Sequence, residues 1–520
     1  MKEHFRNIVF VISSIFILLC VILGIVAPKT FGEVSNALFS LSTEYFGWFY
    51  LISVFIIAMF LIILAISKFG KIKLGGKDAK PEFKFFSWIA LLFSTGLGIG
   101  LVFWGVAEPM SHFYSTPFQD LEPLTPEAAR IAMGYSFFHW GISQWSVFAI
   151  MGLVMGYMQF NKKKNLLIST ALEPVIGKKQ SVKNTIDILA VIATVMGVAT
   201  SIGLGALQTN GGLNGAFGFP TSIWVQVAVI GIMFIGYILS SVTGLHKGMK
   251  ILSNLNLIIA LVLLIFVFIT GPSVFIIESF VLALNDYITH FIEYSLRLQP
   301  YLGETWVKDW TIFYWAWAIA WSPFVGSFVA RVSRGRTIRE FVFGVLIVPP
   351  LVSCVWIAVF GGTAIYFDLY KGTELAQAVN NDITVALFQL LDQLPLTFIA
   401  SIVAIILIFI FLITSADSAT FIMGSMTSKG ILNPSMFSKI VWGILMAAIA
   451  SVLLFTDGLN TLQTASLISA LPFTLVILLL ILSFIKMIKH EPIPITKREI
   501  RRMKQIQAQL ENEKHKDKNK

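Results

Sequence analysis

The segment STGLGIGLVFWGVAEP, residues 94–109, places Gly96, Gly98 and Gly100 in the middle of an apolar stretch. Each glycine lowers helix stability, so three alternating glycines permit an unwound segment whose free backbone groups face a ligand. The alternative is a close helix-packing surface, but packing glycines normally recur at every fourth residue, and this spacing puts Gly98 on a different face. We therefore favour a broken helix, which is the usual place for the substrates and ions of transporters.

The whole chain has the composition of an integral membrane protein. Its 520 residues are 56% apolar and 13% charged, and the mean hydropathy is +0.81, which excludes a water-soluble domain of this length. Apolar stretches of about 20 residues predict an all-α fold with twelve transmembrane helices. We expect these helices near residues 8–28, 47–67, 86–107, 131–158, 186–207, 222–242, 250–271, 310–330, 341–362, 396–426, 437–456 and 463–486.

Lysine and arginine are distributed unevenly over the predicted connections. Of the 38 basic residues, 33 fall in the two tails and in connections such as 68–80, 161–165 and 331–336. By the positive-inside rule, we expect both termini in the cytoplasm and an even number of spans through the plasma membrane. The net charge of +10 follows from this distribution, so it gives no reason to expect a nucleic-acid partner.

Five regions follow from this pattern. Two simple apolar helices precede two blocks of five, which suggests two inverted repeats. An amphipathic stretch between the blocks is expected to lie at the membrane surface. The regions are 1–85 with helices one and two, 86–280 with the first block, 281–309 with the surface helix and a linker, 310–486 with the second block, and 487–520 as a basic cytoplasmic tail.

The tail has the pattern of a helix of its own. TKRE at 496–499 has the spacing of a capping box, and apolar residues then recur at helical spacing. These are Ile500, Met503, Ile506 and Leu510. An apolar stripe with a basic flank favours binding to anionic lipid, so we expect the tail to be a regulatory element.

Aromatic residues crowd the eighth predicted span, which contains FYWAWAIAWSPF at 313–324. At 100° per residue, Trp315 points away from a stripe that the other rings share on one face. The stripe consists of Trp310, Tyr314, Trp317 and Trp321. Tryptophan is costly in a lipid-embedded core unless its N–H finds a partner, so a stripe of this kind indicates more than packing.

The fourth predicted span contributes a second set of rings in FFHWGISQWSVF, residues 137–148. Trp140, Trp145 and Phe148 fit within one arc of the helix. Each single ring is as readily a packing residue as a ligand contact, but two arcs together predict a box. A box of ring faces attracts a cation without hydrogen-bond donors, and quaternary ammonium groups are the best-known case.

Acidic residues are scarce in the predicted spans, where only Asp187 and Asp417 occur. A primary amine or a metal ion would therefore lack its usual carboxylate partners. We expect Asp187 to be a first-turn residue of the fifth helix. His139 has no partner at metal-ligand spacing, so we expect it to be an ordinary hydrogen-bonding residue of the fourth helix.

Hydroxyl groups gather in the tenth predicted span, in FLITSADSATF at 411–421. Isolated Ser and Thr side chains usually bond to the carbonyl one turn back. Here Thr414 and Ser415 are adjacent, and the glycine segment 94–100 offers free carbonyl groups, so an oxygen-lined site for a monovalent cation is a reasonable hypothesis.

Taken together, these motifs resemble the betaine/carnitine/choline transporter family. The resemblance rests on GLGIGLVFWGVAEP, on FHW with Trp145, on 313–341 and on TSADSATF at 414–421, and it covers residues 5 to about 490. The chain is most similar to the glycine betaine transporters of Gram-positive bacteria. This implies the inverted-repeat fold of sodium-coupled amino-acid transporters (LeuT-type), often as a homotrimer, and import of trimethylammonium compounds during osmotic stress.

The resemblance also implies roles for single residues. The substrate site falls on Trp140, Trp145, Phe148, Trp317 and Trp321, beside Gly96, Gly98 and Gly100. The sodium site falls on Ser94, Leu97, Phe411, Thr414 and Ser415. Phe148 occupies a position where well-studied members have tyrosine, and Ala318 replaces one of three tryptophans, so we expect a looser box or a cation nearer Trp321.

We therefore predict a sodium-coupled importer of glycine betaine or a related osmoprotectant, with Na⁺ as coupling ion and no cofactor. Two alternatives stay open. One is a proton-coupled choline or carnitine transporter, for which Asp417 is the nearby titratable group. The other is an osmosensitive channel. An enzyme is not expected, because no paired acids, metal-ligand cluster or nucleophile–base pair lies at membrane depth in the predicted spans.

Overall fold

The computed structural model describes residues 7–493, apart from positions 97, 244, 245, 302, 304 and 432, and also residues 505, 506 and 509. It does not describe the side chains at 95–96 and 241–250. The predicted tail helix, with its capping box at 496–499, therefore lies outside the described residues except at the three positions just named. Leu97 of the predicted sodium site lies outside them as well.

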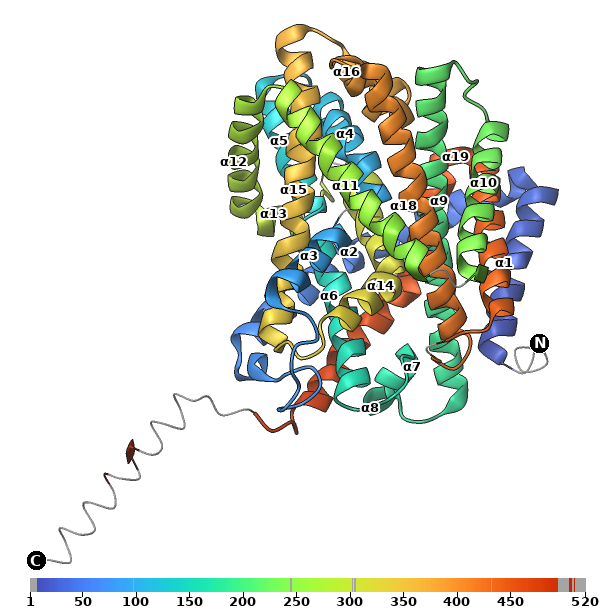
Figure 1. The fold of residues 1–520 in the computed structure, drawn as a ribbon, viewed down its shortest axis with the longest axis vertical. Helices are drawn as coiled ribbons and strands as arrows, with labels where there is room; N and C mark the ends of the chain where they lie inside the picture. The colour runs from blue at the N-terminus through green and yellow to red at the C-terminus, as the bar shows by residue number, and fades with distance from the viewer. Residues whose placement is uncertain are drawn as a thin grey trace, which may run out of the picture.

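Helices form every long element of the described chain (Figure 1). Two predicted spans are each broken into a pair, α3 (Phe85–Gly96) with α4 (Ile99–Tyr114), and α5 (Pro126–His139) with α6 (Ile142–Phe160). The other long apolar helices are α1 (Ile8–Val26), α2 (Pro28–Ile66), α9 (Gln180–Phe217), α10 (Ile223–Thr243), α11 (His246–Thr270), α14 (Phe313–Val332), α15 (Ile338–Lys371), α18 (Thr397–Met426) and α19 (Met436–Ile488).

The number of apolar membrane-length helices in the described chain is ten, or eleven when the bent pair α3–α4 counts as one span. The first ten predicted spans each coincide with one of these elements or pairs. The last two, near 437–456 and 463–486, instead belong to the single 53-residue element α19. Its backbone leaves helical geometry at Asp457 and Gly458, between the two predicted segments.

Shorter elements connect the long helices. The predicted surface stretch forms α12 (Ser273–Thr289), which begins earlier than expected, and α13 (Phe291–Leu296). The other short elements are η2 (Lys68–Lys71), α7 (Ile168–Ala171), α8 (Glu173–Ile176), η3 (Lys308–Ile312, a π-helical turn), α16 (Leu375–Asn381), η4 (Ile383–Val385) and α17 (Ala386–Asp392).

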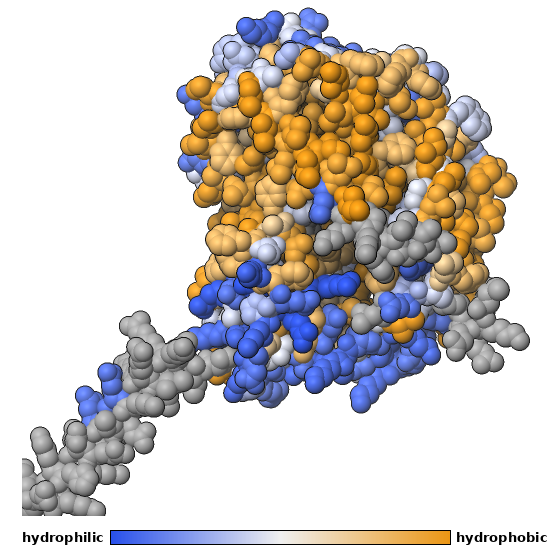
Figure 2. All heavy atoms as spheres, viewed as in Figure 1, coloured by the Kyte–Doolittle hydropathy of each residue, from blue (hydrophilic) through white to orange (hydrophobic). Residues whose placement is uncertain are grey.

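A broad apolar band covers the surface of the molecule in Figure 2, and hydrophilic side chains gather at its two ends. The basic connections meet at the lower end of this view. An isolated main-chain bridge pairs Lys73 with Thr337. Asn161 ties a third connection to them, because its side chain accepts from Gly75 N at 2.7 Å and donates to Lys73 O at 3.0 Å. The band is consistent with a multi-pass membrane protein.

Both ends of the described chain contact connections at this same polar end. Asn7, which caps α1, donates to the carbonyl of Thr427 at 2.6 Å. Glu491, just after α19, accepts from Tyr157 Oη at 2.7 Å and from Lys162 Nζ at 3.0 Å. The first and last long helices therefore have their chain ends on one side of the apolar band.

The close crossing of α6 and α14 sets the distance between the two ring-bearing helices. A Cβ on Gly152 would lie 2.9 Å from the carbonyl oxygen of Gly326. A Cβ on Gly326 would lie 2.7 Å from Met151 Cβ and 2.9 Å from the nitrogen of Gly152. Small residues allow helix backbones to approach in this way inside a membrane. Any larger residue here must move one helix away from the other.

We expect Gly152→Ala to separate α6 from α14, because the atom that its new Cβ would meet belongs to the backbone. Overpacking of this kind costs about 1–3 kcal/mol. Thermal unfolding of the protein in detergent measures the effect. Gly156→Ala, one turn further along the same interface, is the matched control, since its Cβ would lie 3.5 Å from Ala330 Cβ in ordinary contact. Equal melting of the two variants would contradict the close crossing.

Candidate functional site

The glycine segment breaks its span as the sequence predicts. The axes of α3 and α4 differ by 61°, and Gly98 caps α4 with an extended backbone. Gly100 is the place of closest approach to the rings. A Cβ there would lie 2.3 Å from Trp317 Cη2 and 3.1 Å from Trp140 Cη2. The missing side chain therefore allows indoles from two different spans to meet over the start of α4.

The fourth span is also broken, although the sequence predicts a continuous helix over 131–158. α5 ends at His139, and α6 begins at Ile142. The hydroxyl of Tyr287 on α12 accepts from the backbone N–H of Ile142 at 2.8 Å, and it would lie 2.3 Å from a Cβ on Gly141. The hydroxyl of Tyr287 therefore occupies the break and satisfies a backbone donor that the helix end leaves free.

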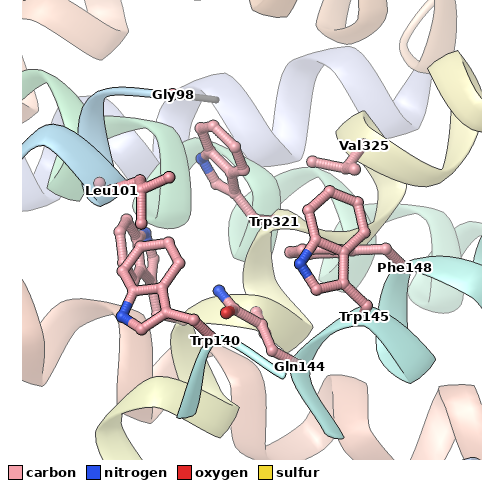
Figure 3. Close-up of a pocket in the computed structure, with 11 residues that line it drawn as sticks. Gly98, Leu101, Trp140, Gln144, Trp145, Phe148, Trp321 and Val325 are labelled. Atoms are coloured by element: carbon pink, nitrogen blue, oxygen red, sulfur yellow. The ribbon is translucent and has the colours of Figure 1, made fainter. Parts of the chain in front are cut away.

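A cavity of about 50 Å³ lies between these elements (Figure 3). The sequence-predicted residues Trp140, Trp145, Phe148, Trp317, Trp321, Gly98 and Gly100 all line it. Gly96 ends α3, and its surroundings lie outside the part of the chain that the structure describes. The cavity is completed by Leu101, Gln144, Ala318 and Val325. The structure thus brings seven of the eight predicted substrate residues together, and their role in binding stays a prediction.

The aromatic rings that line the cavity contact one another edge to face or at a tilt. Trp140 and Trp317 lie edge to face with centroids 6.2 Å apart, and Trp145 meets Phe148 in the same way at 5.2 Å. Trp317 and Trp321 are tilted at 6.3 Å. The indole N–H groups of Trp145, Trp317 and Trp321 are buried without a hydrogen-bond partner in the described structure. The cavity wall thus contains donors that the protein itself leaves unpaired.

The stripe, which runs from η3 into α14, is a continuous ladder of rings, as the helical spacing predicts. Trp310, Tyr314, Trp317 and Trp321 follow one another with centroid distances of 6.3 to 6.5 Å. Trp315 points elsewhere and packs edge-on against Phe138 at 5.3 Å. Only the last two rings of the ladder reach the cavity.

Tyr314, the second ring of the ladder, contacts an acid that the sequence analysis did not predict. We expected the third span to end at residue 107, but α4 continues through Pro109 to Tyr114, so Glu108 lies inside the helix. Its side chain is fully buried. The expectation that the spans contain only Asp187 and Asp417 as acids is therefore wrong. The sequence signal that could have placed Glu108 inside the helix is AEPMSHFY, which can continue the helix beyond the proline.

Each oxygen of Glu108 is engaged by donors from neighbouring elements. Oε2 accepts from Trp140 Nε1 at 2.8 Å and from Tyr314 Oη at 2.5 Å. Oε1 lies 2.6 Å from Nδ1 of His139 and 3.2 Å from Nε2 of His112. The histidine in the predicted fourth span is thus a hydrogen-bonding residue, as expected. The carboxylate joins α4 to α5 and α14 and fixes the indole of Trp140.

Glu108, His112 and His139 have ligand atoms within 4.8 Å of one another, a spacing that would fit a metal ion. The second ring nitrogen of His139 contacts Thr311 Oγ1 at 2.9 Å. Both carboxylate oxygens already accept hydrogen bonds from the protein. We interpret the cluster as a buried hydrogen-bond network.

The predicted sodium residues lie on two separate elements. Ser94 is in α3, and Phe411, Thr414 and Ser415 are in α18. Thr414 Oγ1 donates to the carbonyl groups of Ile410 at 2.9 Å and Phe411 at 3.0 Å. In the described structure, Ser94 and Thr414 share no hydrogen bond. The described residues of the two halves are thus present, without a hydrogen bond between Ser94 and Thr414.

Asp187 does not open its helix, contrary to the prediction. α9 begins at Gln180, seven residues earlier, so Asp187 lies in its third turn. Its carboxylate accepts from the backbone N–H of Ser169 at 3.0 Å and from Ser169 Oγ at 2.6 Å. Its role is still structural, because it holds the short α7 against α9.

Sequence comparisons agree with these features. The model of the betaine/carnitine/choline family of transporters matches residues 8–493. An ectoine/hydroxyectoine transporter of Virgibacillus pantothenticus is 61% identical over 487 residues, which are 94% of this chain and 97% of the relative. A glycine betaine transporter of Bacillus subtilis is 45% identical and covers 96% of this chain and 97% of its own length. A probable glycine betaine transporter of Desulfitobacterium hafniense is 45% identical, with 94% and 98% covered.

Removing the carboxylate of Glu108 should destabilise the protein. In Glu108→Ala the donors of Trp140 and Tyr314 are left buried and unpaired, at about 1–3 kcal/mol each. Glu108→Gln retains one acceptor oxygen, so we expect an intermediate loss. Thermal unfolding in detergent is the measurement. Glu122→Ala, at an exposed position, is the control and should melt like the unmodified protein. A normal melting temperature for Glu108→Ala would show that the network contributes nothing to stability.

Proposed function

The chain belongs to the betaine/carnitine/choline transporter family, and on that premise we propose that it imports glycine betaine or a closely related osmoprotectant together with sodium. Members of this family are transporters and not enzymes, so the family prediction and the prediction of no enzyme are confirmed. The observation that supports the substrate class is the cavity beside the break of α3 and α4, where rings from two other spans surround one space.

The lining of the cavity suits a cation that has been stripped of water. The described lining residues carry no carboxylate, and their aromatic faces supply the negative potential instead. Trp140 adds to this potential, because its N–H donates to the buried carboxylate of Glu108. The three unpaired indole N–H groups match the carboxylate of a zwitterion such as glycine betaine.

Sodium coupling is supported by the chemistry of the two halves of the predicted ion site. A helix end leaves carbonyl groups without intrahelical partners, and α3 ends at Gly96. Thr414 and Ser415 add hydroxyl oxygens without a titratable proton. Proton coupling is the competing proposal. It has two candidate proton carriers: Asp417, which the sequence already suggested, and Glu108, a buried carboxylate.

The length of α19 supports twelve spans. At about 1.5 Å per residue, its 53 residues would extend roughly 80 Å, well beyond a bilayer of about 45 Å. We propose that it crosses twice, with its turn at Asp457 and Gly458. The chain ends then lie together in the cytoplasm, on the side of the basic connections. The irregular starts of both five-helix blocks, the α3–α4 break and the π-helical turn η3, support inverted repeats.

A cyclic amidinium solute is a second candidate substrate. The relative at 61% identity is named as an ectoine/hydroxyectoine transporter, and the two departures from the family's aromatic box, Phe148 and Ala318, both line the cavity. Uptake of glycine betaine and of ectoine by proteoliposomes, with and without a sodium gradient, tests the proposed function directly.

Trp321→Ala should raise the half-saturation concentration for the transported solute far more than Trp321→Phe, which keeps a ring face. A desolvated cation–π contact contributes roughly 2 kcal/mol, which corresponds to about a thirtyfold change in affinity. Uptake kinetics in proteoliposomes provide the measurement. Trp315→Ala is the control, since this ring packs away from the cavity, and it should affect stability more than selectivity. Equal effects of the two Trp321 changes would indicate packing.

Replacing Thr414 and Ser415 together by alanine should strongly weaken the sodium dependence of uptake, because two oxygen ligands are lost. Asp417→Asn should leave that dependence largely in place, since sodium needs no titratable group. Both are measured as initial uptake rates against external sodium at constant pH. Uptake that follows a pH gradient, ignores sodium and disappears in Asp417→Asn or Glu108→Gln would instead establish proton coupling.

A further inference from the structure

Among the described residues that line the cavity, Gln144 carries the one side-chain amide group. It lies in the first turn of α6, just after the break at Gly141, and is 5% exposed. Figure 3 shows its side chain reaching into the space between Trp140 and Trp145. Its Oε1 is buried and has no hydrogen-bond partner in the described structure. A buried acceptor without a donor is costly, so this oxygen is expected to find its partner in the bound solute.

No other side chain in the described lining offers a comparable acceptor. The remaining polar atoms of the lining side chains are indole N–H groups, which only donate. Phe148, on the same helix one turn further on, has no hydroxyl. The described lining therefore combines several unpaired donors with a single strong side-chain acceptor. Donors suit a carboxylate, whereas the acceptor suits an N–H group on the cationic part of the solute.

A trimethylammonium head has no N–H group and leaves Gln144 Oε1 unpaired. A cyclic amidinium carboxylate such as ectoine differs in this respect, because its delocalised cation carries N–H groups on both sides of the amidine carbon. One edge of such a planar cation donates a hydrogen bond while its face stacks on an aromatic ring, as guanidinium groups do. Gln144 and the neighbouring indoles offer these two contacts side by side.

Ala318 points to the same class of solute. In the sequence of α14 it lies between Trp317 and Trp321, and it contributes a methyl group to the lining. A roughly spherical quaternary ammonium group gains from rings on every side, so the small residue removes a contact. A planar cation needs a ring on one face and an acceptor at its edge, and it loses less from an open wall.

We propose that Gln144 Oε1 accepts a hydrogen bond from an N–H group of the solute's cation, and that this contact selects a cyclic amidinium carboxylate over a fully methylated betaine. The inference rests on the proposed function, in which the cavity holds the cationic part of a transported zwitterion. The name of the most identical of the three relatives described above, an ectoine/hydroxyectoine transporter, agrees with it.

The side-chain amide of Gln144 also has an NH₂ group, which could donate a hydrogen bond to the solute instead. This is the alternative that the experiment must distinguish from the proposal. If the NH₂ group donated to the solute's carboxylate, glycine betaine and ectoine would depend on Gln144 equally, because both have a carboxylate. The two roles of the amide are thus separated by comparing solutes that share the carboxylate and differ in N–H donors.

The experiment measures binding and proteoliposome uptake of ectoine and glycine betaine by the full chain and by Gln144→Leu and Gln144→Met. Both variants keep the side-chain bulk and remove the amide. We expect the half-saturation concentration for ectoine to rise about tenfold or more, the effect of losing a hydrogen bond to a charged group, with little change for glycine betaine. Ser146→Ala is the matched control on α6, because its hydroxyl is buried against Ser143 O and does not line the cavity.

Dimethylglycine gives a second test, in which its affinity is compared with that of glycine betaine in the unmodified protein and in the two variants. It has the shape of glycine betaine with one methyl group replaced by an N–H proton. Its affinity relative to glycine betaine should fall in both Gln144 variants, since the acceptor for that proton is gone. An unchanged ratio would overturn the inference.

Two further results would also overturn it. Equal losses for ectoine and glycine betaine in the Gln144 variants would assign the amide to the carboxylate. Uptake of glycine betaine without any binding of ectoine by the unmodified protein would refute the amidinium selection but leave the proposed function intact. Failure of both solutes to bind would instead refute the proposed function.

Discussion

The hydrogen bonding of one buried carboxylate constrains much of this structure. Glu108 is fully buried in a membrane-spanning helix, where an unpaired charge would be prohibitively costly. Donors from α5, the following break and α14 converge on it. Because Trp140 is one of these donors, the same contact that satisfies the core also orients a wall of the cavity. The geometry of the cavity thus depends on a residue that does not line it.

The satisfied network around Glu108 contrasts with the cavity next to it. There, three indole N–H groups and the carbonyl oxygen of Gln144 are buried without partners in the described structure. A protein gains no stability from leaving such groups unpaired. Their concentration around a single space is typical of a surface that a polar ligand completes, and Gly98 has open space where a side chain would stand.

The sequence was most informative where one property repeats along one helix. The alternating glycines predicted the break of α3 and α4, and the ring stripe predicted the ladder on α14. It was least informative where a contact joins distant segments. Gly141 breaks the fourth span because Tyr287 occupies the gap, and nothing near Gly141 in the sequence indicates this. Glu108 was missed because the predicted third span stopped at residue 107, whereas α4 continues through Pro109 to Tyr114. Gln144 has no neighbour that marks it as unpaired until the cavity is assembled.

The position of Glu108 also has a consequence for how the protein is made. During synthesis α4 enters the membrane before its partners exist, since His139 follows by 31 residues and Tyr314 by 206. Until α14 is inserted, the carboxylate has only part of its final set of donors. The helices that precede α14 therefore reach the bilayer with an incompletely satisfied acid and remain dependent on α14. Assembly of the two halves is thus coupled by chemistry, and a nascent chain that stops before α14 is expected to be a substrate for membrane quality control.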